Sequence, residues 1–283
     1  MKVFPFKIPK AKEEAIIYQF DKELILYDKL HQHEEIQISY IEKGEGTIIV
    51  GDTISEYNAG DIIVFGSNLP HVFKSEINKE EELSLVHSIF FDATVIKESL
   101  QVLPESTQIL NFLEDTRNGY KVLSKKEKIY SIIFDLSTAK DTTKFIKFLQ
   151  LLNKLTFSKK KSLSSFRYNK DITDSEGKRM QVVYEFVMNN FDKKISLEEI
   201  ANIANMTKNA FCRYFKVRTN KTFFQFLIEL RIEKASRILT SNHEISVVEI
   251  AELTGFNNIS NFNRKFKEIK KTSPMNYRKR FKN

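Results

Sequence analysis

Histidine, carboxyl and amide side chains recur at short spacing near the N-terminus. In the stretch HQHEEIQ, His31 and His33 are two residues apart and therefore share one face of an extended strand. Glu35 and Gln37 continue that alternation, and His71, farther along the chain, could approach the two histidines. Imidazole nitrogens ligate transition metals, and the same polar side chains can also line a pocket for a small organic effector. A purely structural role for the histidines is the third interpretation.

A second set of side chains with recognition chemistry lies near the C-terminus, where amide, hydroxyl and basic residues gather. Arginine can pair with guanine and asparagine with adenine, while lysine neutralises phosphate. The alternative is that these side chains only keep a helix surface in water. The predicted DNA-contacting residues are Lys208, Asn209, Cys212, Arg213 and Lys216 in one stretch, and Ser260, Asn261, Asn263, Arg264 and Lys267 in another.

These two stretches are copies of one unit. Residues 197–216, LEEIANIANMTKNAFCRYFK, align with residues 247–267, VVEIAELTGFNNISNFNRKFK, after one inserted residue. A serine N-cap with glutamate at the third helical position opens each copy. A tight turn follows the first helix, because Asn205 tolerates and Gly255 favours a left-handed backbone. Each copy is therefore predicted to be two short helices that meet at a steep angle.

The second helix of each copy has an apolar face and a polar face. Phenylalanines four residues apart, Phe211 and Phe215 or Phe262 and Phe266, lie on the same side of their helix. We expect that side to face a core, so that the opposite side remains available to a partner.

Paired helix-turn-helix units are therefore predicted at residues 196–217 and 246–269. Between them, residues 221–242 lack glycine and proline and carry apolar residues at helical spacing. A helix of about 18 residues spans roughly 27 Å, which approaches one turn of DNA at roughly 34 Å. One monomer could then read two successive segments of a major groove.

The charge distribution supports a nucleic-acid partner for the C-terminal part. Residues 159–283 hold 26 Lys and Arg against 13 Asp and Glu, a net charge of +13. The whole chain carries +8, so residues 1–158 carry −5. A wholly basic region joined to a mildly acidic one favours a polyanion partner, because neutralising phosphates releases their counterions.

The C-terminal residues resemble the DNA-binding domain of the AraC/XylS family of bacterial transcription regulators. The match covers residues 177–283 and is most specific over IAELTGFNNISNFNRKFKEIKKTSPMNYRKRF. Lys271 departs from the glycine that the family usually has, and Asn220 departs at the equivalent place in the first unit. Both positions lie just past a helix end, where a left-handed backbone is needed. Cys212 stands where family members often direct a side chain at bases.

The N-terminal part changes to β-rich patterns. Runs such as IQISYIEKGEGTIIVGD predict a small antiparallel β-barrel or jelly roll over residues 20–92. The spacing of His31-x-His33, Gly44-x-Gly46, Gly60-Asp61 and Pro70-His71 resembles the cupin-type effector domain that many AraC/XylS regulators carry.

Metal-binding cupins add a carboxylate four or five residues after the second histidine. This chain has Gln37 or Ile38 there, and only Glu35 could substitute. We therefore predict no bound metal and no cofactor, and His31, His33, Glu35, Gln37 and His71 are the candidate effector-binding residues. No glycine-rich phosphate loop or activated nucleophile predicts a catalytic residue elsewhere.

The expected architecture is an α+β protein of two domains. Residues 1–157 form a cupin-like β-barrel with accessory helices over residues 93–157, whose apolar stripes predict either dimerisation or packing on the barrel alone. Residues 158–176 are polar and are predicted to be a linker. Residues 177–283 form an all-α domain with two helix-turn-helix units joined by a long helix.

Composition limits the class of protein. The apolar share is 41%, and no apolar run reaches the roughly 18 residues of a membrane span. The N-terminus shows no secretory signal, and a single cysteine agrees with a reducing compartment. We expect a cytoplasmic protein, associated with the nucleoid through DNA and with no membrane partner.

The combined expectation is a sequence-specific transcription regulator and not an enzyme. The resemblance implies activation at a double-stranded DNA promoter or operator, an RNA polymerase partner, a homodimer and a small-molecule effector in the barrel. One alternative is a regulator without a ligand, controlled by its abundance or by a protein partner. The other is a metal-dependent cupin enzyme with a DNA-binding tail.

Overall fold

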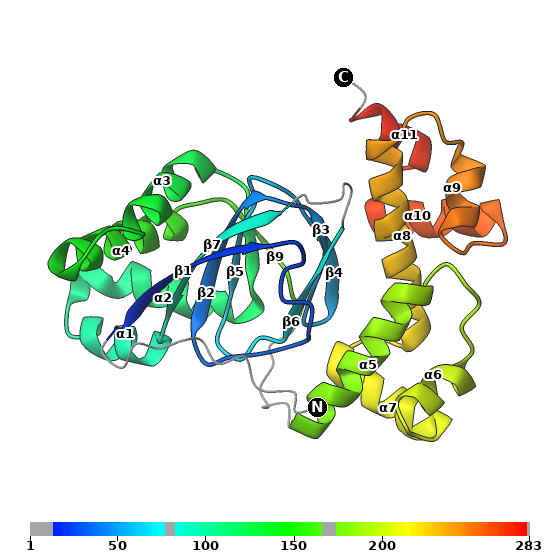
Figure 1. Cartoon of the computed structure of the whole chain (residues 1–283), viewed down its shortest axis with the longest axis horizontal. Coiled ribbons are helices and arrows are strands. Elements are labelled where there is room, and N and C mark those ends of the chain that lie inside the picture. Colours follow the sequence, from blue (N-terminus) through cyan, green and yellow to red (C-terminus); the bar gives the residue numbers. More distant parts are fainter. Residues whose placement is uncertain (1–13, 77–82, 166–173, 282–283) are drawn as a thin grey trace. The chain divides into compact units, whose positions relative to one another are not determined.

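The computed structural model describes residues 14–76, 83–165 and 174–281. The chain divides into two compact units, Met1–Gly177 and Lys178–Asn283. In its described residues the first unit combines two sheets with helices, and the second contains helices only (Figure 1). The predicted α+β fold class, with a β-rich N-terminal part and an all-α C-terminal part, is confirmed.

Two antiparallel sheets form the body of the first unit. One is six-stranded in the order β1-β7-β2-β5-β8-β9, and the other is three-stranded in the order β4-β3-β6. The strands are β1 (Ile16–Glu23), β2 (Ile36–Lys43), β3 (Gly46–Val50), β4 (Thr53–Tyr57), β5 (Ile62–Phe65), β6 (His71–Ser75), β7 (Ser84–Phe91), β8 (Tyr120–Val122) and β9 (Lys160–Ser162).

Alternation along the strands of the six-stranded sheet separates two cores. Ile38 on β2 lies opposite Val64 on β5 and Ile89 on β7, and all three are buried in the core that the helices share. Phe65, the residue after Val64 on β5, and Val86, three residues before Ile89 on β7, point the other way and face the core between the two sheets. One face of the larger sheet is therefore covered by helices, and the other encloses the interior of the barrel.

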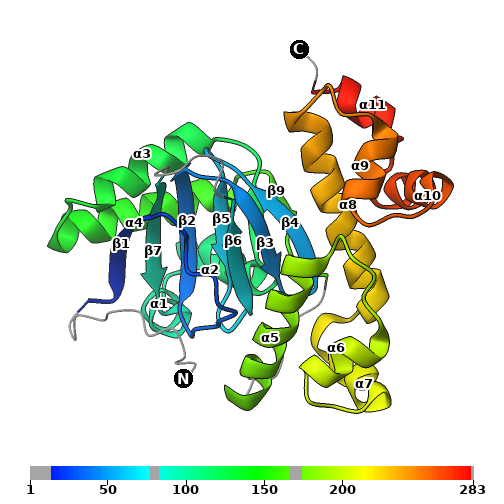
Figure 2. The same cartoon turned by 45° about the vertical axis from the view of Figure 1, so that its right-hand side comes forward.

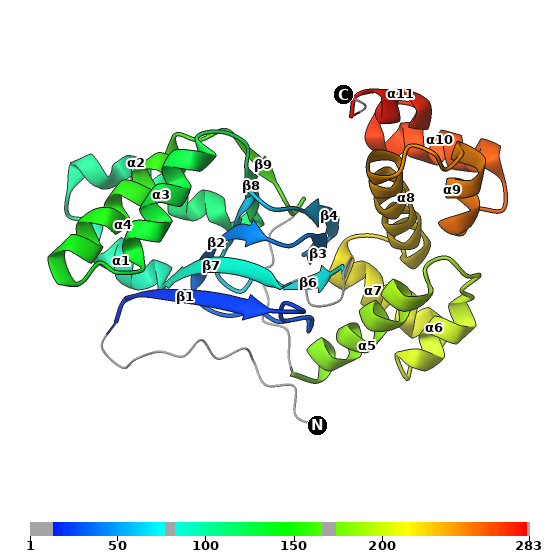
Figure 3. The same cartoon turned by 45° about the horizontal axis from the view of Figure 1, so that its top comes forward.

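The helices of the first unit pack on one face of the larger sheet (Figure 3). They are α1 (Ala93–Leu100), α2 (Thr107–Asp115), α3 (Lys126–Leu136) and α4 (Asp141–Thr156), with short 3-10 helices η1 (Pro104–Ser106) and η2 (Thr116–Asn118) beside α2. Ile129, Ile133 and Leu136 of α3 are buried in the core of the sheet. Most of the apolar stripe predicted over residues 93–157 therefore covers the protein's own sheet.

The start of the predicted linker is instead part of the larger sheet. Residues 160–162 form β9, which pairs with β8, and Leu163 is buried between the sheets. Asp52 accepts hydrogen bonds from the backbone N–H of Ser165 and, at 2.9 Å, from the hydroxyl of Ser164. The polar sequence concealed this strand because its outward side chains are lysines and serine. Residues 166–173 of the predicted linker lie outside the described residues.

The second unit is an array of helices (Figure 2). Its elements are α5 (Asp174–Asn190), which begins within the predicted linker, α6 (Leu197–Ile203), α7 (Lys208–Thr219), α8 (Phe223–Ser241), α9 (Val247–Leu253), α10 (Ile259–Lys270) and α11 (Pro274–Lys279). The helix predicted over residues 221–242 is confirmed as α8, which has 19 residues. The predicted start of the last helix, with Ser273 as N-cap and Pro274 as the first helical residue, is also confirmed.

Aromatic packing joins the helices of the second unit. Phe215 of α7 lies 5.7 Å from Phe223 and 5.5 Å from Phe226 of α8, measured between ring centroids. Tyr184 of α5 stacks on Phe226 at 5.3 Å. Farther along α8, Ile232, Ala235 and Leu239 share a core with α9 and α10. The long helix therefore supports both helix-turn-helix units.

Candidate functional site

The first helix-turn-helix unit is held by reciprocal capping and a left-handed turn. The Ser196 hydroxyl accepts from the backbone N–H of Glu199 at 3.1 Å, and the Glu199 carboxylate accepts from the N–H of Ser196. After α6, Asn205 has φ of 53°, as its sequence position predicts. Thr207 then caps α7, and Asn220 ends that helix with φ of 53°. The helix therefore begins and ends at defined residues.

The second helix-turn-helix unit repeats this construction, with a glycine in the turn. Ser246 caps α9, Asn258 caps α10, and Lys271 ends α10 with φ of 58°. Gly255 has φ of 80°, and a Cβ atom there would lie 2.6 Å from the carbonyl oxygen of Asp192. Only glycine fits both the backbone conformation and the space at this turn.

Each second helix buries its phenylalanines and exposes its polar face. Phe211 and Phe215 on α7, and Phe262 and Phe266 on α10, are fully buried. The ten side chains predicted to contact DNA are all exposed: Lys208, Asn209, Cys212, Arg213, Lys216, Ser260, Asn261, Asn263, Arg264 and Lys267. Each of the two helices therefore presents an exposed surface opposite its phenylalanines, and we call these surfaces the α7 face and the α10 face.

Some of these side chains are already paired on the surface. Lys208 lies 2.7 Å from Glu198 of α6, and its hydrogen bond lowers the pKa of that carboxyl. Arg264 donates to the Asn261 side chain at 2.9 Å and lies 3.8 Å from Glu268. Such exposed pairs are weak, so phosphates and base edges can replace them. The Asn261 contact already holds the Arg264 guanidinium against the α10 face.

The sequence did not reveal a set of contacts that connects the two helix-turn-helix units. Arg231 of α8 donates through Nε to the carbonyl oxygen of Phe191 and through Nη2 to that of Lys193, both at 2.7 Å. Its guanidinium also lies 5.8 Å from the ring centroid of Phe256, in the turn of the second unit. A single arginine in a charged helix gives no periodic signal, so only the structure shows what it contacts.

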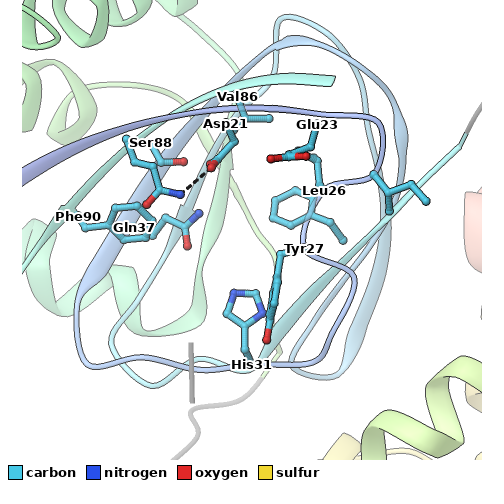
Figure 4. Close-up of a pocket in the computed structure, with 12 residues that line it drawn as sticks. Asp21, Glu23, Leu26, Tyr27, His31, Gln37, Val86, Ser88 and Phe90 are labelled. Atoms are coloured by element: carbon cyan, nitrogen blue, oxygen red, sulfur yellow. Dashed lines mark hydrogen bonds between the residues drawn. The ribbon is translucent and has the colours of Figure 1, made fainter. Parts of the chain in front are cut away.

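The first unit contains a cavity of about 280 Å³ between its two sheets. Figure 4 shows the carboxylates of Asp21 and Glu23 toward one end and His31 beside Tyr27 toward the other. The lining residues are Gln19, Asp21, Glu23, Ile25, Leu26, Tyr27, His31, Gln37, Phe73, Val86, Ser88 and Phe90. Of the five predicted effector-binding residues, His31 and Gln37 line this cavity.

The described residues that line the cavity carry either a negative charge or no charge. None of its described lining residues is a lysine or arginine. Burial raises the pKa of Asp21, the charge of Glu23 raises it further, and a 2.7 Å hydrogen bond from Gln19 opposes the rise. Gln37 donates to Ser39, whose hydroxyl lies 2.8 Å from that of Ser88. The cavity therefore offers hydrogen-bonding groups on an otherwise apolar wall.

The predicted histidines converge beside this cavity. His31, His33 and His71 are buried, and each can offer one nitrogen such that all three lie within 4.8 Å of one another. Burial lowers the pKa of His31 to about 3 and also lowers the pKa values of His33 and His71. The three imidazoles are therefore neutral near pH 7.

Glu35 lies in the bend that precedes β2 and not on a strand, in contrast to the alternation expected from the sequence. Its carboxylate lies 3.8 Å from Nδ1 of His33, on the opposite ring edge from Nε2, which faces Gln37 at 3.0 Å. The expectation that Glu35 could take the place of a missing carboxylate ligand stays a prediction, and the potential ligands that converge in the described residues are His31, His33 and His71.

No helix in the described residues is long and apolar enough to cross a membrane.

Two family models match the chain. A helix-turn-helix domain model matches residues 200–280, and a cupin domain model matches residues 27–88. The first match spans both helix-turn-helix units, and the second covers His31, His33 and His71, of which only His71 lies in a strand, β6.

Relatives match over most of the chain. YdeC of Bacillus subtilis, described as an uncharacterized HTH-type transcriptional regulator, is 24% identical over 261 residues, which are 89% of this chain and 87% of YdeC. RhaR of Mannheimia succiniciproducens, an HTH-type transcriptional activator, is 24% identical over 263 residues, again 89% of this chain and 87% of the relative. A solved structure of the DNA-binding domain of AdpA with a target DNA is 27% identical, covers 35% of this chain and 88% of that chain, and has a TM-score of 0.34.

Proposed function

This chain belongs to the AraC/XylS family of helix-turn-helix transcriptional regulators, and from that premise we propose which DNA it reads and what controls it. It is a DNA-binding regulator with an N-terminal cupin domain, and not an enzyme. Our proposal is that the α7 and α10 faces of one monomer read two successive major-groove segments of a promoter, and that a small effector in the cavity controls this binding.

One observation carries the DNA part of the proposal: two helix-turn-helix units of the same construction, α6–α7 and α9–α10, pack along the helix α8. The helix has 19 residues, which corresponds to about 28 Å at roughly 1.5 Å per residue. Successive major-groove segments on one side of DNA are roughly 34 Å apart. The length of α8 therefore suits two recognition helices that enter neighbouring turns.

The side chains suit different tasks within each face. Arg213 and Arg264 can pair with guanine, and Asn209, Asn261 and Asn263 suit adenine. The lysines suit phosphates, which position the protein without reading sequence. Cys212 is exposed, but a thiol is a weak donor, so we expect little base discrimination from it.

The cavity supports control by an effector. A regulator controlled only by abundance or by a protein partner needs no space between its sheets, whereas this barrel encloses about 280 Å³ beside buried His31, Gln37 and Ser88. An effector must bind the DNA-competent arrangement more tightly than the alternative arrangement, because otherwise it cannot shift the equilibrium.

Exposed apolar side chains on the accessory helices support a homodimer. Phe134 on α3 is 54% exposed, and Phe145 and Ile146 on α4 are 41% and 50% exposed. A self-complementary contact between two copies would cover such a surface. We further propose activation through RNA polymerase in the cytoplasm, in keeping with the relative that is named an activator.

Selection of bound DNA from a random pool by the full-length protein, at physiological salt, tests this proposal. Two short enriched elements about one helical turn apart are the expected result. Binding that depends on salt but enriches no sequence would mean that the protein only holds phosphates, and the proposal of sequence reading would then be wrong.

A further inference from the structure

We propose that the cavity of the first unit binds a small organic cation, an amine on an apolar body, with its ammonium group against the carboxylates of Asp21 and Glu23. This inference rests on the proposed control of DNA binding by an effector in the cavity, and it names the chemical class of that effector. It is carried by two carboxylates on the cavity wall, by their lack of a basic partner and by the apolar side chains around them.

The carboxylates lie on the inner face of an edge strand. Gln19, Asp21 and Glu23 alternate along β1 and line the cavity, whereas Tyr18 packs on the core that the helices share. Strand β1 forms the edge of the larger sheet, beside β7. A strand that only closed an apolar core would carry apolar side chains on its inner face. Three polar side chains in succession therefore indicate that this wall contacts a polar ligand.

Neither carboxylate has a basic partner. Among the described residues, Asp21 and Glu23 form no ion pair, and no lysine or arginine lines the cavity. The two carboxyl groups are two residues apart on one face of a strand, so their negative charges repel each other. Burial and the charge of Glu23 both raise the pKa of Asp21. A cation between the carboxylates would remove this repulsion and pair both charges.

Gln19 adds an acceptor without a partner to the same wall. Its Nε2 donates to Asp21 at 2.7 Å, which fixes the orientation of the amide because an ionised carboxylate only accepts. Its Oε1 is buried and has no hydrogen-bond partner within the described residues. Such atoms are uncommon in folded proteins. An ammonium group carries three N–H donors, so it suits a wall of acceptors, whereas a carboxylate or phosphate does not.

The remaining lining selects an organic cation over an inorganic one. Leu26, Phe73 and Phe90 are buried side chains of the lining, and Val86 on β7 lies directly opposite Asp21 on β1. Aromatic rings attract an ammonium group as well as the carbon atoms attached to it. Mg²⁺ and Ca²⁺ require oxygen ligands on most sides and gain nothing from such a wall. An amine on an apolar body would use both parts of the cavity.

The volume of the cavity limits the size of the ligand. About 280 Å³ corresponds to roughly nine water molecules at roughly 30 Å³ each, so a ligand of about ten non-hydrogen atoms would fill it. Ile25 and Tyr27 are 46% and 39% exposed, and Glu23 is exposed as well. The cavity is therefore open to solvent beside these residues, and a small amine can enter there.

Three ligands that share one alkyl chain test the charge preference. Calorimetry measures the binding of hexylamine, hexan-1-ol and hexanoate to the full-length protein at pH 7, where they carry a positive charge, no charge and a negative charge. We expect hexylamine to bind at least about 10-fold more tightly than hexan-1-ol, since hydrogen bonds between charged groups are the strong ones. Hexanoate should bind most weakly, because the carboxylates of the cavity repel it.

Two variants remove one charge each and keep the shape of the wall. Asp21→Asn and Glu23→Gln should each lower the affinity for hexylamine by about 10-fold and leave the affinity for hexan-1-ol unchanged. Glu98→Gln is the matched control, because Glu98 is exposed on α1 and does not line the cavity. Retained binding of hexan-1-ol shows that the cavity of a variant is intact, so a loss confined to the amine cannot arise from misfolding.

Three results would overturn the inference. The first is hexan-1-ol or hexanoate that binds the wild type as tightly as hexylamine does. The second is an affinity for hexylamine that Asp21→Asn and Glu98→Gln lower equally, because the amine would then bind elsewhere. The third is the absence of saturable hexylamine binding at millimolar concentration in wild-type protein that unfolds cooperatively.

DNA binding measured in parallel separates this inference from the proposed function. The affinity for the selected DNA site is measured with and without saturating hexylamine, and a change in the wild type that Asp21→Asn abolishes supports both proposals. Hexylamine that binds as expected but leaves DNA affinity unchanged supports the cation site and counts against control from the cavity. A change produced by hexan-1-ol or hexanoate but not by hexylamine supports that control and overturns only the cationic class.

Discussion

Gly255 and Arg231 lie in contact where the two helix-turn-helix units meet: a Cβ atom on the glycine would be 2.9 Å from Cζ of the arginine. The same guanidinium donates to two carbonyl oxygens that precede the first unit. One arginine therefore links the residues before the first helix-turn-helix unit with the turn of the second, and we expect its contacts to influence how the α7 and α10 faces are placed.

Gly255→Ala should destabilise the second unit by about 2 kcal/mol or more, from left-handed strain together with steric overlap. Gly60→Ala is the control, because Gly60 has φ of 84° but nothing within 4 Å of its Cβ position. That variant should cost only the backbone strain of about 1 kcal/mol. Chemical denaturation followed by circular dichroism measures the free energy of unfolding of both variants. If both lose the same amount of stability, steric crowding at Gly255 is unimportant.

Arg231→Lys should change the spacing of DNA elements that the protein prefers. Lysine keeps the charge but loses the planar group that reaches two carbonyls at once. We expect a loss of stability of about 1.5 kcal/mol and a weaker dependence of affinity on the distance between the two elements. Gel-shift titration of sites that differ by single inserted base pairs measures the dependence. An unchanged ranking of spacings, with uniformly lower affinity, would show that Arg231 only stabilises the fold.

Arg264→Ala should cost about 1 to 3 kcal/mol on the selected site and relax the base preference at one position. Lys279→Ala, at the exposed end of α11, should weaken binding to every sequence alike and reduce the salt dependence of affinity. Titration against the selected site and single-base variants compares the two. Losses that are equal on all sequences for both variants would contradict the assignment of the α10 face.

Asp21→Asn should stabilise the first unit near neutral pH. Burial raises the pKa of Asp21 in the folded protein, and the nearby Glu23 raises it further. A raised folded-state pKa means that stability is fully present below the ordinary carboxyl value of 3.8 and is lost as pH rises through the folded-state value. The advantage of the amide should therefore be largest at pH 7 and vanish below about pH 4.

Thermal unfolding between pH 3.5 and pH 7.5 follows this difference for Asp21→Asn. Glu98→Gln is the control, since Glu98 is exposed on α1 and faces water. A gain for Asp21→Asn that stays constant across this range would mean that its carboxylate carries no electrostatic penalty in the folded protein.

Much of the second unit could be predicted because the sequence signals for its helices and turns involve residues close together in the chain. Serine caps, a left-handed residue and phenylalanines at helical spacing each report on a few neighbouring residues, and the structure confirms them at Ser196, Gly255 and Phe262. The start of helix α5 was missed because its first turn, DSEG, reads as a polar loop. The burial of Val183 and Val187 and the stacking of Tyr184 on Phe226 of α8 arise from contacts between helices, which the sequence does not show.

The cavity depends on contacts between distant strands and was predicted only in part. His31 and Gln37 were found through their spacing, whereas Asp21, Ser88 and Phe90 lie on β1 and β7, whose pairing the sequence does not specify. The direction of each ring nitrogen was also beyond prediction, because backbone carbonyls orient the three histidines.

The two helix-turn-helix units are alike in construction but unequal in what they present. In the repeat, Arg213 corresponds to Arg264, but Cys212 of the α7 face corresponds to Asn263 of the α10 face. A monomer that spans two groove segments is therefore asymmetric along the DNA, because its two faces differ. Inverting its site on a promoter would reverse the direction in which the rest of the protein points. A binding site for this chain is therefore defined by its orientation as well as by its position.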